Sequence, residues 1–236
     1  MDSKDFIIKV ASDKETSYAE EICHEMEESA KARGTGIAKR SPAYVADKMH
    51  EGKAIIALHK DGTWAGFCYI ETWGHGQYVA NSGLIVSPKF RKYGLATAIK
   101  HKAFELSRTK YPNAKLFGLT TGLAVMKINS ELGYEPVTYS ELTQDEEFWS
   151  GCKSCVNFDI LTSKGRKNCL CTAMLYDPVE KQKQEEERKK ALADAEKKNS
   201  LWQNFLNIKN SIFPPSEKQE DIKEEKSKLL SFFSFA

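Results

Sequence analysis

The sequence has no long apolar run, almost no excess of either charge and few cysteines, and each absence limits what the chain can be. No stretch reaches the roughly 18 consecutive apolar residues that a membrane-spanning helix needs. Lys and Arg number 35 against 33 Asp and Glu, so the net charge of +2 predicts no strong attraction to nucleic acid or to a membrane. The first ten residues, MDSKDFIIKV, do not have the pattern of a secretory signal. We therefore expect a cytoplasmic protein whose six cysteines are thiols or metal ligands.

The stretch SGLIVSPKFRKYGLATA at residues 82–98 joins an expected strand to an expected helix. Residues 84–86 are the apolar end of the strand, and Pro88 ends it because proline cannot continue a backbone ladder. A helix that begins near Gly94 exposes unpaired N–H groups and the positive end of its dipole. Such a loop suits a pyrophosphate. The residues expected to form it are Arg91, Lys92, Tyr93, Gly94, Leu95 and Ala96.

Hydrophobic spacing predicts the element order β-α-α-β-β-β-α-β-α-β over the first part of the chain. The expected strands are residues 6–10, 53–59, 63–73, 77–86, 115–120 and 134–139, and the expected helices are residues 14–33, 42–50, 95–109 and 123–132. After these, the pattern predicts a short acidic helix at 141–149. A hairpin is expected from residues 156–161 and 168–176.

The composition changes abruptly after Pro178, which predicts a domain at residues 1–178 and a charged helical extension at 179–236. Residues 179–200 are nearly all charged or small, as in a solvated helix with Glu–Lys pairs. An apolar stripe follows at 201–213, so the helix is expected to fold back on the domain or to join a second copy in a homo-oligomer. The end of the tail is expected to be flexible.

The spacing R-x-x-G-x-A after V-x-P-x-F resembles the acetyl-CoA-binding signature of the GNAT acetyltransferase superfamily. The resemblance implies an α/β (α+β) fold, a mixed and mostly antiparallel twisted sheet flanked by helices. It also implies transfer of an acyl group from a thioester to an amine. Two parallel strands, ending near Val86 and starting near Lys115, would be splayed apart. Backbone at Leu84, Ile85 and Val86 would hold the pantetheine arm, and an N–H near Ile85 would polarise the thioester carbonyl.

The superfamily places a proton-donating tyrosine four residues before the glycine of the last helix-to-strand turn. That glycine is Gly133 here, and the position holds Asn129. Asn129 can hydrogen-bond a thiol but cannot supply a proton, so it is a candidate for contact with the cofactor and the general acid is unassigned. Glu71 and His75 lie at the expected end of the central strands, but each is equally well explained as a solvated residue, so the base is unassigned too.

Three segments resemble a narrower family, the acetyltransferase domain of bacterial N-acetylglutamate synthase. They are IAKRS at 37–41, KLFGLTT at 115–121 and residues 133–142. The resemblance implies that Arg40, with Ser41 beside it, binds the α-carboxylate of the amino acid; a surface cation is the alternative. The family has an arginine after L-T-T, whereas Thr121 is followed here by glycine, and Lys127 is the candidate replacement for that charge.

The resemblance favours an N-acyltransferase that uses acetyl-CoA or succinyl-CoA and acylates a small amino acid, with glutamate in arginine biosynthesis as the first hypothesis. One alternative is a GNAT acetyltransferase for another amine or for a protein. The other is a module that binds CoA or a partner without turnover.

Four of the cysteines form the pattern Cys152-x-x-Cys155 and, after thirteen residues, Cys169-x-Cys171. Four thiolates at such spacing resemble the ligands of a structural zinc site. The alternative is a set of reduced cysteines around the last hairpin.

Overall fold

The structure is a computed structural model that describes residues 5–34 and 38–212. The chain divides into two compact units, residues 1–181 and 182–236. Each unit is described by itself.

A seven-stranded sheet forms the centre of the first unit, in the order β1-β2-β3-β4-β5-β7-β6. Its strands are β1 (Phe6–Val10), β2 (Ala54–His59), β3 (Trp64–Trp73), β4 (Tyr78–Val86), β5 (Lys115–Thr120), β6 (Glu135–Val137) and β7 (Thr172–Tyr176). Only β4 and β5 are parallel neighbours, and the other pairs are antiparallel. The expected mixed and mostly antiparallel sheet is therefore confirmed.

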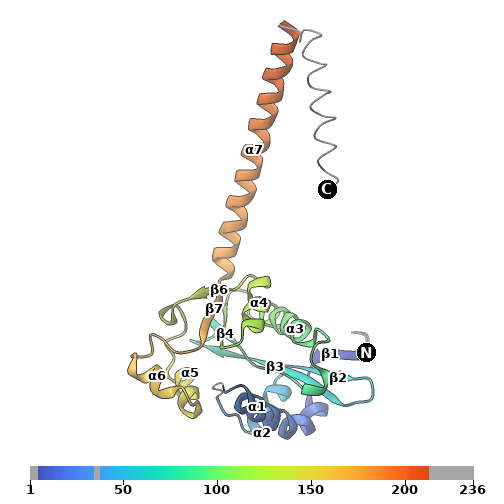
Figure 1. The fold of residues 1–236 in the computed structure, drawn as a ribbon, viewed down its shortest axis with the longest axis vertical. Coiled ribbons are helices and arrows are strands. Elements are labelled where there is room, and N and C mark those ends of the chain that lie inside the picture. The colour runs from blue at the N-terminus through green and yellow to red at the C-terminus, as the bar shows by residue number, and fades with distance from the viewer. Residues whose placement is uncertain (1–4, 35–37, 213–236) are drawn as a thin grey trace, which may run out of the picture. The chain divides into compact units, whose positions relative to one another are not determined.

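Helices cover both faces of this sheet (Figure 1). The helices α1 (Ala19–Arg33) and α2 (Pro42–His50) lie on one face, and α3 (Leu95–Lys110) and α4 (Leu123–Glu131) lie on the other. Ser41 caps α2 by accepting a hydrogen bond from the Tyr44 N–H at 3.2 Å, and proline follows at the first helical position, as expected.

Alternation along the strands divides the apolar side chains between the two faces. In β2, Ile55 and Ala57 pack with Ile99 of α3, whereas Ile56 packs with Met49 of α2. The sheet is therefore buried on both sides, which fixes the position of β4 and of the loop after it.

The expected hairpin at residues 150–176 is wrong. Residues Phe158–Ser163 form a short helix, α6, and only Thr172–Tyr176 is a strand. This strand, β7, pairs with β5 and β6. The apolar residue Val156 does not mark a buried strand face, because its side chain is 76% exposed. The acidic helix is also shorter than expected: α5 spans Glu146–Ser150.

The long helix α7 spans Pro178–Ile212 and includes both the charged segment and the apolar stripe predicted from the sequence. Asp177 caps its start, because its carboxylate accepts hydrogen bonds from the N–H groups of Val179 at 3.0 Å and Glu180 at 3.3 Å. The stripe is exposed, and Trp202 stacks on Phe205 with ring centroids 5.6 Å apart. The predicted flexible end, residues 213–236, lies outside the described residues. None of the described helices is long and apolar enough to cross a membrane.

Candidate active site

The parallel strands β4 and β5 run together over only three residues before they separate. Their register pairs are Tyr78–Lys115, Val79–Leu116 and Ala80–Phe117. Past these pairs, β4 continues along β3 and β5 continues along β7. The facing edges beyond Ala80 therefore have no strand partner, which leaves backbone donors and acceptors available to a ligand. This is the splayed pair that the resemblance implies, and residues 84–86 lie on its open edge.

The side chain of Asn129 lies at the closed end of the splay. It is 1% exposed, and a Cβ built on Gly118 of β5 would lie 4.0 Å from its Nδ2 atom and 3.5 Å from the backbone oxygen of Asn81. Nδ2 makes only a long contact of 3.6 Å with the Met174 sulfur, and Oδ1 has no hydrogen-bond partner among the described residues. An unpaired buried amide oxygen costs about 1–3 kcal/mol. A ligand N–H that reached the splay would remove this cost.

A second polar group, at Asn81, fixes β4 where the strands separate. Its amide donates to the Ser107 hydroxyl of α3 at 2.9 Å, and its Oδ1 accepts from the Tyr134 hydroxyl at 3.0 Å. Burial raises the pKa of Tyr134, so this phenol stays a neutral donor. All of the polar side-chain groups in this contact are satisfied, which distinguishes Asn81 from Asn129.

A β-bulge lies farther along β4. Tyr69 of β3 is in register with Ser82, and Phe67 is in register with Ile85, so Gly83 and Leu84 together face one residue of β3. Gly83 has φ +66°, and a Cβ there would come within 2.7 Å of the Tyr69 ring. Only glycine fits this bulge without strain. The bulge lies directly beside Ile85, the expected donor to a thioester carbonyl. That expectation is wrong for Ile85 itself, because the Ser87 N–H donates to the Ala65 carbonyl of β3 at 3.0 Å and alternation turns the Ile85 N–H to the same side. The N–H groups of Leu84 and Val86 face the open edge instead.

The loop after β4 is ordered by contacts to α1. The Arg91 guanidinium donates to the Ser29 hydroxyl at 2.7 Å, pairs with Glu25 at 3.2 Å and donates to the Val86 carbonyl at 3.2 Å. Arg91 therefore holds the loop in place, and part of its charge is already compensated.

The start of α3 is open. Its N-cap residue, Gly94, has φ +75° and offers no side chain to the first N–H groups of the helix. Lys92 also adopts a positive φ of +72°. Together with Tyr93, Leu95 and Ala96, these residues form the uncapped helix end that the sequence predicted as a pyrophosphate loop.

A polar network on the α1 and α2 face of the sheet surrounds Arg40. Its Nε donates to the Tyr69 hydroxyl at 2.6 Å, and its guanidinium lies 5.5 Å from the centre of the Tyr44 ring. The Tyr44 hydroxyl donates to Glu71, which also pairs with the buried Lys48 at 2.7 Å. Burial raises the pKa of Tyr69 while Arg40 opposes that effect. Arg40 thus lies next to the tyrosine that packs on the Gly83 bulge, so the two candidate sites are adjacent.

The other candidate acceptor residues differ in their placement. The Ser41 hydroxyl is used as a helix cap. Thr121 follows β5 directly, at the open end of the splay. Lys127 and Asn129 are two residues apart on α4, about 200° around the helix, so exposed Lys127 points away from the splay into which Asn129 is buried. The placement of Lys127 gives no support to its expected role.

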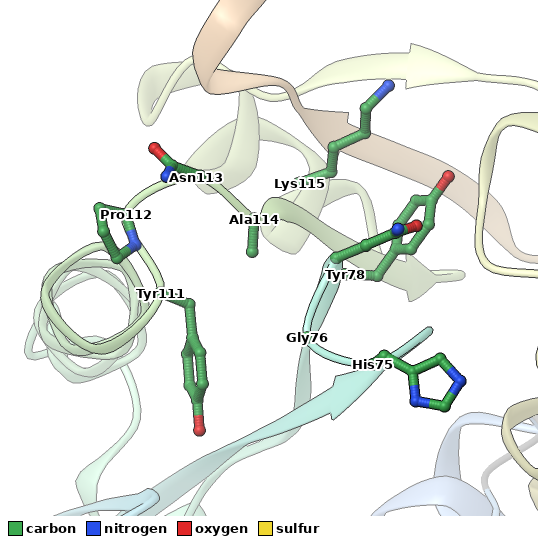
Figure 2. A pocket seen from close by; sticks show the side chains of 9 residues that line it. His75, Gly76, Tyr78, Tyr111, Pro112, Asn113, Ala114 and Lys115 are labelled. Carbon is green, nitrogen blue, oxygen red and sulfur yellow. The ribbon is translucent and has the colours of Figure 1, made fainter.

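A groove of about 430 Å³ lies at the other end of the β4–β5 pair (Figure 2). It is formed around the first residues of both strands, Tyr78 and Lys115, and by the turn before β4 and the turn after α3. His75 lines this groove, away from the splay. The structure therefore does not bring His75 to the candidate active site.

The four cysteines of the expected zinc site lie in one region. Burial and the neighbouring thiols of Cys169, Cys155 and Cys152 raise the pKa of Cys171 to about 12. The Cys155 sulfur accepts from the Asn157 N–H at 3.5 Å. Within the part of the chain that the structure describes, however, no three His, Cys, Asp or Glu side chains form a group that could hold a metal ion. The expected zinc site therefore has no support in the geometry.

Sequence reasoning missed Asn81, the bulge glycine and the tyrosines around Arg40. A glycine inside an apolar strand signals a bulge, so Gly83 could have been found from the sequence. Tyr44 and Tyr69 are twenty-five positions apart, and nothing local indicates that their rings meet at 5.7 Å.

Comparison with solved structures finds the GNAT fold. The N-acetylglutamate synthase of Neisseria gonorrhoeae, solved with coenzyme A and N-acetyl-glutamate, aligns with a TM-score of 0.53 at 17% identity, covering 73% of this chain and 35% of that one. A Mycobacterium tuberculosis protein solved with CoA aligns with a TM-score of 0.53 at 17% identity, covering 72% of this chain and 98% of that one.

A third structure is the GNAT superfamily phosphinothricin acetyltransferase of Sinorhizobium meliloti in complex with AcCoA. It aligns with a TM-score of 0.50 at 13% identity and covers 73% of this chain and 88% of that one. The chain spans about a third of the length of the gonococcal enzyme. No protein-family model matches the sequence, and the search of curated proteins gave no match. The predicted resemblance to GNAT acyltransferases is thus confirmed for the fold.

Proposed function

We propose that the chain is an acyl-CoA-dependent N-acyltransferase that acylates the amine of a small amino acid, with glutamate as the acceptor and arginine biosynthesis in the cytoplasm as its setting. The observation that supports this most directly is the splay of β4 from β5, closed by the buried and unpaired amide oxygen of Asn129. A pantetheine arm carries amide N–H groups that can donate to this oxygen.

The donor side of the proposal uses backbone more than side chains. The unpaired edge of β4 at residues 84–86 binds the pantetheine amides, and the uncapped start of α3 binds the pyrophosphate. Lys92 adds a positive charge to this loop, whereas Arg91 is already engaged with α1. An acetyl or a succinyl thioester satisfies these contacts equally.

The chemical step is direct transfer. The amine nitrogen attacks the thioester carbonyl, the carbon–sulfur bond breaks, and the thiolate leaves and takes up a proton. An N–H on the open edge of β4 beside the Gly83 bulge, that of Leu84 or Val86, stabilises the negative charge on the carbonyl oxygen. One such donor contributes roughly 10²-fold or more in rate. Asn129 hydrogen-bonds the arm and is not a proton source.

The acceptor side depends on Arg40. Its guanidinium forms no ion pair with a carboxylate among the described residues, and Tyr69 and Tyr44 hold it beside the bulge. A substrate α-carboxylate at Arg40 would bring the α-amine toward the thioester carbonyl. Thr121, which follows β5 at the open end of the splay, is a candidate hydroxyl for the acceptor.

The decisive measurement is CoA release by the purified full chain with acetyl-CoA and succinyl-CoA, across the twenty amino acids and a panel of polyamines and peptide amines. Turnover with glutamate supports the proposal. Turnover only with peptides or polyamines contradicts the substrate, and CoA binding without any turnover contradicts the activity.

A variant pair tests the observation that carries the proposal. Asn129→Ala should weaken CoA binding about tenfold in calorimetry, because one buried hydrogen bond to the ligand is lost. Asn113→Ala, in the groove at the far end of the strand pair, is the matched control and should bind CoA as the unchanged protein does. Equal affinities for the two variants would refute the role of the splay.

A further inference from the structure

Glu71 is the one carboxylate in the network around Arg40. It lies on β3 two residues beyond Tyr69, so both side chains point to the same face of the sheet. Its carboxylate pairs with Lys48 at 2.7 Å and accepts from the Tyr44 hydroxyl. Its side chain is 18% exposed, so it is not closed off from solvent. The acyl-transfer step described above does not use this group.

The charges of the network are arranged as two separate poles. Among the described residues no carboxylate pairs with Arg40, whereas Glu71 is a carboxylate that retains acceptor capacity after Lys48 and Tyr44. The Tyr44 ring lies between them. The Arg40 guanidinium is 5.5 Å from the centre of the Tyr44 ring, and the Tyr44 hydroxyl contacts Glu71. A positive and a negative pole therefore lie on either side of one tyrosine ring, on the same face of the sheet.

We propose that these two poles recognise a zwitterion, with Arg40 binding the carboxylate and Glu71 binding the ammonium of a free α-amino acid. The inference rests on the proposed function and names its acceptor class. An α-amino acid carries both charges within about 3 Å, and charge-assisted hydrogen bonds add about 2.8 Å at each end, so the molecule reaches over one phenol ring. A polyamine would leave Arg40 unpaired, and a peptide N-terminus would offer no free α-carboxylate to it.

Glu71 acts here by its charge and is a positioning residue. Lys48 and the Tyr44 hydroxyl both contact the carboxylate and fix its position. Its role is to hold the ammonium on the face of the sheet that it shares with Tyr69, so that the same nitrogen approaches the thioester carbonyl from this face after it loses a proton.

The test measures binding of acceptor probes to the full chain saturated with CoA, so that it does not depend on turnover. The probes are glutamate, glutarate, which lacks the ammonium, and 4-aminobutyrate, which lacks the α-carboxylate. The unchanged protein should bind glutamate about 10- to 100-fold more tightly than either analogue, since each lacks one charge-assisted contact.

Glu71→Gln should weaken glutamate binding about 10- to 100-fold and should bind glutarate more tightly than the unchanged protein does, because the repulsion between two carboxylates is removed. A residue with a structural role only would weaken both ligands alike. Glu105→Gln, which changes an exposed carboxylate on α3, is the matched control and should change neither affinity. Glutarate binding that is unchanged or weakened in Glu71→Gln overturns the inference.

Removing Glu71 leaves buried Lys48 without its partner, so the double variant Glu71→Gln/Lys48→Met provides a second arm in which neither charge is orphaned. It should show the same gain in glutarate affinity. If the chain binds no CoA, the proposed function fails on its own, whatever the probes show. If the chain binds CoA and another α-amino acid in place of glutamate, the zwitterion inference stands, and only the choice of glutamate as the acceptor is refuted.

Discussion

The buried lysine on α3 gives the sharpest physical prediction about this fold. Lys100 is 2% exposed, and its ammonium lies 5.3 Å from the centre of the Tyr134 ring, next to the polar group of Asn81, Ser107 and Tyr134. No carboxylate pairs with it among the described residues. Burial lowers the pKa of Lys100 from 10.5 to about 8, with a small opposing effect of Cys68.

The lowered pKa of Lys100 changes the free energy of unfolding with a definite sign and size. At about 1.36 kcal/mol per pH unit, a charged Lys100 costs the folded state about 3 kcal/mol below pH 8. Between pH 8 and 10.5 the unfolded chain binds more protons than the folded chain, so the free energy of unfolding rises with pH. The contact with Tyr134 offsets about 1–2 kcal/mol. Lys100→Met should therefore stabilise the protein by roughly 1–2 kcal/mol at pH 7, and this gain should vanish as the pH approaches 10.5.

Urea unfolding at pH 7, 8, 9 and 10 measures this difference. Lys102→Met is the matched control, since Lys102 lies on the same helix but is 46% exposed and pairs with Glu105. The control should shift the free energy of unfolding by less than about 0.5 kcal/mol at every pH. A Lys100→Met variant that is less stable at pH 7, or whose difference does not change with pH, would refute the reasoning.

Three further predictions concern other parts of the molecule. Gly83→Ala should cost about 2 kcal/mol or more in unfolding free energy and weaken CoA binding, since the added Cβ meets the Tyr69 ring at 2.7 Å and φ is +66°; wild-type melting and affinity would contradict this. At pH 8 the thiol of Cys171 should react with iodoacetamide about 10³-fold more slowly in the folded than in the urea-unfolded chain, because its pKa is raised from 9.0 to about 12. Peptide mass spectrometry measures this rate difference. Protection that disappears with a chelator would indicate a bound metal instead. Burial raises the pKa of Asp177, but Lys115 and the cap N–H groups lower it more, so the pKa is below its usual value. Asp177→Ala should therefore lower the unfolding free energy by about 1 kcal/mol at neutral pH. This loss should disappear in acid, as the carboxylate of the unchanged protein becomes protonated.

The sequence predicted the strands and helices well where a local rule governs them. Apolar runs bounded by turn residues mark the buried strands β2 to β5, and Ser41-Pro42 marks the start of α2, because both signals depend on neighbouring residues. The prediction of a hairpin at residues 150–176 failed in its first strand, because Leu161 is the one buried apolar residue at positions 150–171 and no buried strand face forms there. Its cysteines suggested a metal by spacing alone.

The candidate site also has a part that the sequence predicts and a part that it does not. The loop at 91–96 follows from one continuous stretch, whereas the network of Arg40, Tyr69 and Glu71 depends on contacts between α2 and β3. Lys127 was selected for its charge, and helix geometry turns it away from the splay. Side chains that meet only after folding leave no pattern in the sequence.

The short pairing of β4 with β5 has a mechanical consequence. Within the described part of the chain, three register pairs form the seam between a four-stranded half of the sheet, β1 to β4, and a three-stranded half made of β5, β7 and β6. An extended molecule lying in the open part of the seam would complete the missing rungs and tie the halves together. Occupancy should therefore slow amide exchange on both facing edges at once, so that the ligand acts as a removable strand of the sheet.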